Sequence, residues 1–465
     1  MNRNNFLPHV ALALVIVLIA AFAGQVRKWR NDWHAHEGGV KTRLEARVDS
    51  EAHRRGQDRV KKGSELFVRF RPGVSNEQIQ AITGRLHDRI EDQIESVSGL
   101  DLIEDDQGTD VATLLEEYSR LPEVEYVDEI YKIQADGLNP VLPNDPRFDE
   151  QWALANNGQN GGTKGADISA TRAWATTKGS DKVIVAVLDS GVDYTHRDLA
   201  MNIWTRPENI KEYEDKDLGA IDDVHGYNAL DNDGDPMDEN GHGTHCAGII
   251  GAEGGNNEGI TGVNWNVKIM PLKFMDASGS GTTKDAIEAI NYVIDRKKAG
   301  VNVRIISASW GSTQKSRALE DVISKAKDAG ILFVAASGNS SADTDRTPHY
   351  PSSYNLGNVI SVAALDRNDE LTSFSNYGAK SVHIAAPGKD ILSTWLDNDF
   401  REASGTSMAT PVVAGVAALV LSKNPNLSVD DLRKRLLNSV DKLPALKGKV
   451  VSGGRINAAK AVGAE

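Results

Sequence analysis

Short unbroken apolar runs alternate with amphipathic stretches from residue 151 to the C-terminus. Four of the runs are typical of buried strands: 183–188, 269–274, 305–308 and 331–336. Between them, apolar residues recur at helical spacing in 286–294, which stops at Gly300, and in 318–326, which stops at Gly330. Strands that are apolar at every position are buried on both faces, as in a parallel sheet covered by helices on both sides. We therefore predict an α/β domain over 151–465 with a doubly wound, mostly parallel sheet and a site in the loops that follow the strands.

A different pattern occupies residues 64–135. The run 66–70 alternates apolar and polar residues, as in a strand, and Ser75 with Gln78 has the spacing of a capping box at the start of a helix. A second helical pattern covers 111–118, and a further extended run follows it. The order strand, helix, strand, helix, strand predicts a small α+β domain with a ferredoxin-like fold.

The remaining segments are an N-terminal apolar stretch and two polar connections. Residues 10–24 are apolar or small, and the stretch is short for a membrane span, which needs about 20 residues. We predict that 1–24 is a secretory signal peptide or, because basic residues follow it directly, a retained membrane anchor. The polar, charged residues 25–63 are predicted to be a linker. Residues 136–150 carry three prolines among polar residues and predict an exposed connector open to cleavage.

Composition and charge narrow the class of protein. Of 465 residues, 40% are hydrophobic and 25% charged, as in an ordinary soluble globular protein. The formal net charge of -14 argues against nucleic acid as a general partner. Cys246 is the single cysteine, so an exported form has no intramolecular disulfide and needs another stabilising element, such as bound metal. No repeat or heptad pattern indicates an assembly, so we expect a monomer.

Three motifs place reactive side chains among small residues. They read VLDSGVD at 187–193, NGHGTHCAG at 240–248 and GTSMATP at 405–411. Asp189 ends a buried strand, and His242 and Ser407 each stand where a helix begins. A serine hydroxyl becomes a useful nucleophile when an imidazole takes its proton and a carboxylate holds the imidazole in one tautomer. The three side chains are therefore what nucleophilic acyl transfer requires.

These motifs closely resemble those of the subtilisin-like serine proteases, whose chain order is also Asp, His, Ser. The resemblance covers about residue 151 to the end. It implies that Asp189 orients the histidine, that His242 is general base and then acid, and that Ser407 forms an acyl-enzyme. The segment AASGN at 335–339 resembles the one whose asparagine donates to the oxyanion, which implies that role for Asn339.

The same resemblance implies a substrate cleft and a propeptide. In the family, the peptide substrate lies as an extra strand between two backbone segments, here Gly279, Ser280, Gly281 and Ser309, Trp310, Gly311. Side-chain pockets are implied to be lined by Ala336, Ser337, Gly338 and His349, without indicating one preferred side chain. The region 64–135, which opens LFVRFRPG, resembles the family's propeptides. It is thus expected to assist folding, to inhibit the enzyme intramolecularly and to be cut off by self-cleavage between about 133 and 151.

Two candidate Ca²⁺ sites follow. The resemblance implies one that uses the side chains of Asp198 and Asn256 with carbonyl oxygens near Gly254, Glu258 and Ile260. The second lies in the run 231–238, where Asp231, Asp233, Asp235 and Asp238 crowd together. This run is not an EF-hand, since His242 stands at the twelfth position, where a glutamate is expected. It is either a cation site or a solvated acidic turn.

The sequence thus predicts a secreted or extracytoplasmic serine endopeptidase, made as a self-processing zymogen, that acts on peptides and proteins. The alternative is a catalytically silent domain of the same fold that binds peptides or serves as a calcium-dependent surface module, although all four catalytic positions are intact. A related carboxyl-type peptidase is excluded by His242 and Asn339. Cys246 lies on the same helical face as His242, but its apolar surroundings favour a buried, inert thiol over a nucleophile.

Overall fold

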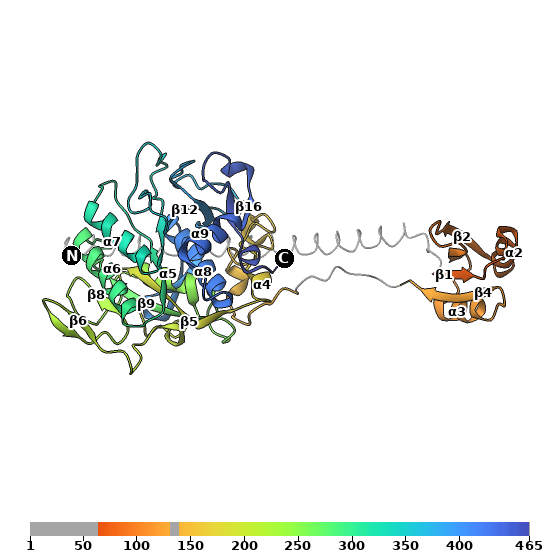
Figure 1. The fold of residues 1–465 in the computed structure, drawn as a ribbon, viewed down its shortest axis with the longest axis horizontal. Helices are drawn as coiled ribbons and strands as arrows, with labels where there is room; N and C mark the ends of the chain where they lie inside the picture. The colour runs from red at the N-terminus through yellow and green to blue at the C-terminus, as the bar shows by residue number, and fades with distance from the viewer. Residues whose placement is uncertain (1–63, 131–138, 465) are drawn as a thin grey trace, which may run out of the picture. The chain divides into compact units, whose positions relative to one another are not determined.

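The structure, a computed structural model, describes residues 64–130 and 139–464 (Figure 1). The chain divides into two compact units, Met1–Ala135 and Asp136–Glu465, and each is described by itself. The predicted signal peptide or anchor at 1–24 and the predicted linker at 25–63 lie outside the described residues, so both stay predictions.

The N-terminal unit is a four-stranded antiparallel sheet with two helices. Its elements are β1 (Glu65–Phe70), α2 (Asn76–Leu86), β2 (Asp88–Gln93), β3 (Leu100–Asp105), α3 (Val111–Ser119) and β4 (Val124–Glu129). The strand order β2-β3-β1-β4 with this chain order is the ferredoxin-like arrangement. The predicted capping box is present: the Gln78 amide donates to Ser75 Oγ at 3.3 Å, and the Ser75 amide donates to Gln78 Oε1 at 2.8 Å. The α+β prediction is confirmed.

The sequence pattern did not predict one strand of this unit, β2. We predicted three strands, whereas the structure has four, of which β2 and β3 form an antiparallel hairpin. The β2 sequence, DRIEDQ, has one apolar residue, and most of its positions are exposed. A charged strand at the edge of a sheet resists pairing with other chains. The β2 sequence therefore lacks the alternation of apolar and polar residues that is typical of a half-buried strand.

The second unit is built on a nine-stranded sheet in the order β16-β17-β13-β12-β11-β10-β5-β9-β8. All neighbours run parallel except β16 and β17. The strands are β5 (Gly179–Asp189), β8 (Tyr227–Asn228), β9 (Asn266–Lys273), β10 (Val303–Ala308), β11 (Leu332–Ala336), β12 (Val359–Leu365), β13 (Ile384–Pro387), β16 (Val440–Lys442) and β17 (Gly454–Ile456). Two hairpins lie outside this sheet: β6 (Tyr213–Asp215) with β7 (Gly219–Ile221), and β14 (Ile391–Trp395) with β15 (Asp399–Ala403). All four predicted strands are present.

Helices cover both faces of this sheet. They are α4 (Ala170–Ala173), α5 (His242–Gly251), α6 (Thr283–Lys298), α7 (Arg317–Asp328), α8 (Thr406–Lys423), α9 (Val429–Asn438) and α10 (Ala458–Val462). Short 3₁₀ turns cover Phe148–Glu150, Gln159–Gly161, Ala200–Asn202, Leu396–Asn398 and Pro444–Leu446. The two predicted helical stripes are α6 and α7, and Gly300 and Gly330, which follow them, have φ of 102° and 78°. The predicted doubly wound fold is confirmed.

Strand β5 shows why the sheet strands read as unbroken apolar runs. Val183, Val185 and Val187 belong to one core cluster, which α5, α8, α9 and α10 complete. The alternate residues Ile184 and Ala186 belong to the cluster under α6 and α7. Because both faces are covered, every position from Val183 to Leu188 is apolar.

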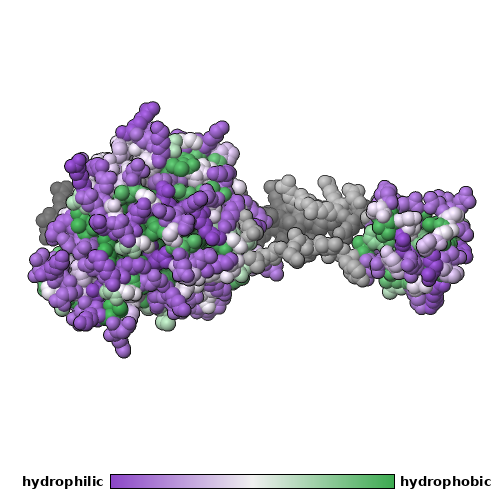
Figure 2. All heavy atoms as spheres, in the orientation of Figure 1, coloured by the Kyte–Doolittle hydropathy of each residue, from purple (hydrophilic) through white to green (hydrophobic). Residues whose placement is uncertain are grey.

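Helix α8 is the central core helix of this unit (Figure 1). Among the described residues it is the one helix that is long and apolar enough to cross a membrane, but 83% of its most apolar window is buried inside the unit. The surface shown in Figure 2 is largely hydrophilic, with small scattered apolar patches. Burial in the core therefore explains the apolar character of α8.

The predicted connector is not exposed throughout. Asp145 and Phe148 are 4% and 7% exposed. The Arg147 amide donates to the Gly259 carbonyl at 2.9 Å, and the Val141 amide donates to that of Thr171 at 2.9 Å. The expectation of an exposed connector is therefore wrong for its second half, which the proline content did not indicate because packing decides it. Residues 131–138 lie outside the described part of the chain.

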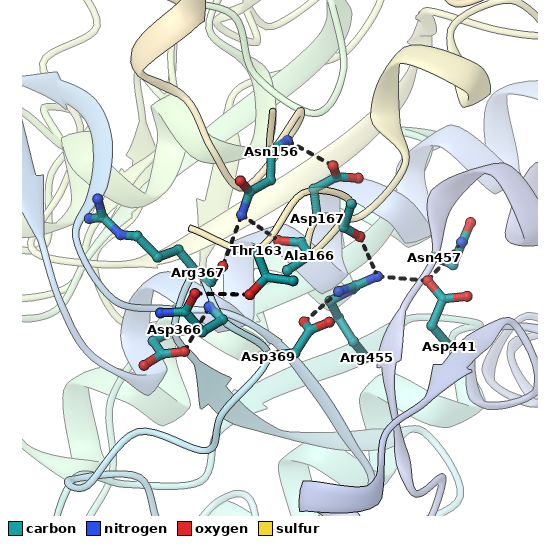
Figure 3. Close-up of polar contacts among 12 residues, drawn as sticks. Asn156, Thr163, Ala166, Asp167, Asp366, Arg367, Asp369, Asp441, Arg455 and Asn457 are labelled. Atoms are coloured by element: carbon teal, nitrogen blue, oxygen red, sulfur yellow. Dashed lines mark hydrogen bonds and ion pairs between the residues drawn. The ribbon is translucent and has the colours of Figure 1, made fainter. Parts of the chain in front are cut away.

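A buried ionic network joins distant parts of this unit (Figure 3). The Arg455 guanidinium, on β17, is 4% exposed and pairs with Asp369 and with Asp441, the latter at 2.8 Å. It also donates to the Gly165 carbonyl at 3.2 Å. Lys460 and Asn457 donate to the same Asp441 carboxylate, at 2.6 and 3.0 Å. One cation thus holds together the segment before β5, the loop after β12 and the C-terminal strands.

Replacing Arg455 should lower the stability of this unit. We expect Arg455→Ala to lower the free energy of unfolding by about 3–5 kcal/mol, because it removes a buried guanidinium and leaves the partly buried Asp369 carboxylate without this counter-charge. Arg346→Ala is the control, since it breaks an ion pair whose arginine is 86% exposed, and should cost less than about 1 kcal/mol. Denaturant titration followed by circular dichroism measures both, and equal losses would contradict the network's role.

Candidate active site

Asp189 and His242 meet at the carboxyl end of the sheet. Asp189 is the last residue of β5 and is fully buried, and His242 is the first residue of α5. His242 Nδ1 lies 2.7 Å from Asp189 Oδ1. The Ser190 amide also donates to this oxygen, at 2.8 Å. The contact leaves the other imidazole nitrogen, Nε2, available to a neighbouring group.

Close backbone approach and one carboxylate hold the histidine in place. A Cβ on Gly243 would overlap the Gly191 carbonyl, so only glycine lets α5 begin this near to β5. Asp238 accepts hydrogen bonds from the amides of Asn240, Gly241 and Thr244, at 2.9 to 3.0 Å, and from the hydroxyls of Ser190 and Thr244. Asp238 therefore satisfies amides at the start of α5 that the helix itself leaves unpaired.

This arrangement corrects one predicted metal ligand. Both Asp238 oxygens are already occupied by five protein donors, so the inclusion of Asp238 in the second Ca²⁺ set is wrong. The spacing of the aspartates in 231–238 does not distinguish a residue that holds a helix start from a cation ligand. The separation depends on which donors the tertiary structure brings near.

The pKa of His242 results from opposing effects. Burial lowers it, but the charge of Asp189 and the hydrogen bond to it outweigh burial, and Asp238 adds to the increase. The pKa of His242 is therefore raised above its usual value of 6.5. Its side chain is 28% exposed, so the imidazole remains open to a substrate.

Ser407 is the second residue of α8 and lies beside the end of β10. Its hydroxyl donates to the Ser309 carbonyl at 3.0 Å, and its own carbonyl accepts the Ser309 hydroxyl at 2.8 Å. Among the described residues, its recorded hydroxyl contact is thus with Ser309 and not with His242. Hydrogen bonds of this kind are often long or unformed without substrate, so the arrangement is compatible with proton transfer to His242.

Asn339 is fixed against the same helix start. It follows β11 through Gly338, whose φ is 103°. Its Oδ1 accepts both the amide and the hydroxyl of Thr406, each at 2.9 Å. With Oδ1 occupied by these two donors, the Nδ2 group is left to donate to another partner next to Ser407.

One cavity connects His242 with both predicted substrate segments. It measures about 550 Å³, and its lining includes Gly279, Ser280 and Gly281 on one side and Ser309, Trp310 and Gly311 on the other. The structure thus brings together the two segments expected to flank an extended peptide. Of the residues expected to line side-chain pockets, Ala336 and Ser337 are buried and Gly338 packs on the His349 ring.

Sequence reasoning missed the apolar part of this cavity. Met275, Leu319 and Tyr350 line it, and they come from the end of β9, from α7 and from the segment after β11. Leu319 belongs to a helical stretch that the sequence assigns to the core, and Met275 directly follows the predicted strand 269–274. Nothing in the sequence distinguishes a core residue from one at the cavity wall.

Cys246 lies beneath Asp189 and His242. Ligand atoms of all three lie within 4.8 Å of one another. The thiol is fully buried and donates to the Ser407 carbonyl at 3.6 Å, and burial raises its pKa well above the usual value. A thiol held protonated and away from the cavity is a poor nucleophile, as we expected.

The loop 254–260 and two buried carboxylates form the first candidate cation site. Asn256 Nδ2 donates to Asp198 Oδ1 at 3.0 Å, and the Ile260 amide donates to Oδ2 at 2.9 Å. Asp145, which sequence reasoning missed, accepts the Gly255 amide at 2.8 Å, while its Oδ1 is buried without a hydrogen-bond partner in the part of the chain that the structure describes. Burial raises the pKa of Asp198 to about 6, and the charges of Asp145 and Glu253 add to it. Two neighbouring buried carboxylates of this kind fit a hard cation such as Ca²⁺.

The predicted carbonyl ligands of this site have free oxygens. None of the hydrogen bonds among the described residues ends on the carbonyl oxygens of Gly254, Glu258 or Ile260. In the acidic run, by contrast, Asp231, Asp233 and Asp235 are exposed and accept hydrogen bonds from nearby groups of the loop and from Tyr194. The second site, without Asp238, stays a prediction.

Comparison with known proteins identifies the family. Residues 180–454 match the Subtilase family, Peptidase S8. That match spans more than half of the chain and contains all three motifs. The chain belongs to the subtilase family of serine peptidases.

Individual subtilases differ in how much of their length this chain spans. A thermophilic serine proteinase from Bacillus sp. (strain AK1) is 40% identical over 290 residues, which cover 62% of this chain but 64% of that protein. Thermitase from Thermoactinomyces vulgaris is 37% identical over 320 residues, which cover 69% of this chain and 99% of thermitase. A protease from Pseudoalteromonas arctica has a similar structure, with a TM-score of 0.56 at 29% identity over 69% of this chain and 99% of that one. A cold adapted subtilisin-like serine proteinase gives 0.50 at 31% identity over 60% and 90%.

The contact between Asp189 and His242 makes a direct prediction about titration. We expect Asp189→Asn to lower the pKa of His242 to below 6.5, because the mutation removes the charge that raises the pKa and leaves burial, which lowers it. The imidazole would then be neutral over a wider range of pH. NMR titration of the histidine ring protons measures the change, with Asp193→Asn as a control that leaves His242 unaffected. An unchanged pKa in Asp189→Asn would contradict the assigned cause.

Proposed function

We propose that this chain is a serine endopeptidase, made as a self-processing precursor, in which Asp189, His242 and Ser407 form the catalytic triad. The observation that carries the proposal is the 2.7 Å contact between His242 and Asp189 beside a cavity that is also lined by Ser309, whose carbonyl accepts the Ser407 hydroxyl. Membership of the subtilase family supports serine peptidase chemistry on peptide substrates. The apolar segment 10–24 supports export, either as a cleaved signal peptide or as an anchor.

The chemistry assigns each group one task. Ser407 Oγ attacks the peptide carbonyl while its proton passes to His242 Nε2, and Asp189 holds the imidazole and stabilises its charged form. The proton then passes to the leaving amine, and water hydrolyses the acyl-enzyme by the same route. Asn339 Nδ2 and the Ser407 amide donate to the oxyanion, and one such donor is typically worth about 3 kcal/mol.

The N-terminal unit acts in this proposal as propeptide, folding assistant and intramolecular inhibitor. Its ferredoxin-like fold and its place before the catalytic unit support this role. We place the self-cleavage between about 131 and 140, because Val141, Arg147 and Phe148 pack within the catalytic unit. A cut after Asp145, within 145–150, would separate Asp145 from the cation site that it borders.

Intact mass tests the triad and self-processing together. The chain is produced from Gln25 onward as wild type, Ser407→Ala and Ser404→Ala, each with and without a fluorophosphonate serine probe. We expect wild type to lose its N-terminal unit and gain one probe adduct, because activated Ser407 attacks both. Ser407→Ala should stay at full length and unlabelled.

Ser404→Ala is the matched control, since Ser404 is an exposed serine three residues from the nucleophile. It should behave as wild type does. If wild type stays at full length and unlabelled at pH 8 in the presence of Ca²⁺, the serine endopeptidase proposal fails, and a peptide-binding domain without activity becomes the better explanation.

We further propose that Asp145, Asp198, Asn256 and the carbonyl oxygens of Gly254, Glu258 and Ile260 bind Ca²⁺ as a structural ion. Bound Ca²⁺ would offset the mutual repulsion of the two buried carboxylates and fix the loop against the second half of the connector. A ligand that binds the folded state alone stabilises it by mass action. The ion would take no part in the chemical step.

Chelation tests this site. We expect EDTA to lower the melting temperature of the enzyme by about 5 °C or more, which re-addition of Ca²⁺ restores. Without the ion, Asp198 has a folded pKa raised from 3.8 to about 6, so its ionisation destabilises the fold as pH rises through this range. In EDTA the melting temperature should therefore rise as pH is lowered from 7.5 to 5.5, and less so in Asp198→Asn. A melting temperature that EDTA leaves unchanged would contradict the Ca²⁺ site.

A further inference from the structure

The environment of the proposed nucleophile shows where a substrate side chain must go. Strands β10 and β11 are parallel neighbours, with Ala308 opposite Ala335. Beyond their carboxyl ends, Ser309 contacts Ser407, and Asn339 contacts Thr406. The nucleophile therefore lies over the gap between the two strand extensions. The side chain of P1, the residue whose carbonyl is attacked, has to enter this gap.

The His349 imidazole already lies in that gap. A Cβ placed on Gly311, in the β10 extension, would overlap His349 Cε1 and lie 2.8 Å from Nδ1. A Cβ placed on Gly338, in the β11 extension, would lie 3.0 Å from Cδ2 and 3.1 Å from Cγ of the same ring. Both glycines thus pack directly on the imidazole. The ring spans the space between the two extensions.

The backbone around His349 is held on both sides. Its amide donates to Ser353 Oγ at 3.1 Å, and its carbonyl accepts the Ser353 amide and the Ser352 hydroxyl, each at 2.8 Å. The next residue, Tyr350, exchanges two backbone hydrogen bonds with Ser312, at 2.7 and 2.8 Å. The segment is therefore attached to the β10 extension, and the position of the imidazole follows from the fold.

The ring presents a neutral surface. Burial lowers the pKa of His349, which the Ala336 carbonyl offsets in part. Its Nδ1 is buried without a hydrogen-bond partner among the described residues. At the neutral to alkaline pH where His242 acts as a base, His349 therefore carries no charge that would attract an acidic side chain. What remains is its volume.

We propose that His349 closes the P1 pocket and restricts cleavage to bonds that follow small residues such as Gly, Ala and Ser. This inference rests on the proposed endopeptidase function and names its substrate class. Aromatic and long aliphatic or basic P1 side chains are excluded because the ring occupies the depth that they need. Affinity then comes mainly from backbone pairing along the two cleft segments.

The test compares P1 preference in the purified full chain and its variants. Peptide p-nitroanilides that differ only at P1, with Ala, Leu or Phe, are assayed for kcat/KM after counting active sites with a fluorophosphonate. We expect wild type to favour Ala over Phe by about tenfold or more, since misfit in a pocket is worth factors of about 10–200. In His349→Gly, the Phe to Ala ratio should rise by about tenfold or more.

Two further measurements keep the result unambiguous. His225→Ala is the matched control, because the His225 ring stacks on Tyr194 and is not among the groups that pack on Gly311 and Gly338, so the ratio should stay at its wild-type value. Wild-type digestion of an unfolded protein, read by mass spectrometry, should show Gly, Ala and Ser at P1, and this result needs no variant to fold. A wild type that is labelled but cleaves after Phe as readily as after Ala would overturn the role of His349 alone. A protein that is neither labelled nor active would overturn the endopeptidase function and, with it, this inference.

Discussion

A parallel sheet that is buried on both faces restricts where polar chemistry can occur in this protein. Because α5 and α8 cover one face of β5 and α6 and α7 cover the other, a polar side chain within Val183–Leu188 would be buried and would need a hydrogen-bond partner. Reactive groups therefore come where strands end. Asp189 ends β5, and Ser309 and Asn339 follow β10 and β11 at the same edge of the sheet.

The helix starts at this edge depend on very close backbone packing. Gly243 lies against the Gly191 carbonyl, so α5 begins almost in contact with the end of β5, and its first side chain reaches Asp189. At α8, the Thr406 amide and hydroxyl bind Asn339, and the following amide of Ser407 has no hydrogen-bond acceptor among the described residues at the helix start. The small residues in the three motifs thus permit this close packing. They bring two helix N-termini and three strand ends to one place, where partial positive charge favours an anion.

Buried and partly buried carboxylates in the same unit are satisfied in three different ways. Asp238 receives five hydrogen bonds and secures the start of α5. Asp441 is paired with Arg455 and Lys460, which connects the ends of the unit. Asp198, next to Asp145, accepts hydrogen bonds from Asn256 and the Ile260 amide. Among the described residues no cationic side chain is a main cause of its pKa shift, and the pKa is raised to about 6. The third arrangement is the one that suits a bound cation, and it separates structural aspartates from cation-binding ones where sequence spacing cannot.

The sequence by itself determined the sheet strands β5, β9, β10 and β11, the helices α6 and α7, the capping box at Ser75 and the motifs that carry Asp189, His242 and Ser407. These features depend on local patterns of burial and on residues whose chemistry is visible one at a time. Only the tertiary structure decided that β2 is a strand, that Asp145 borders the loop 254–260 and that Asp238 holds a helix start. It also decided that the His349 ring lies between Gly311 and Gly338. The physical reason is the same in each case: an edge strand, a shared carboxylate and a filled pocket depend on groups that are distant in the chain, and neither periodicity nor motif spacing records which distant groups become neighbours.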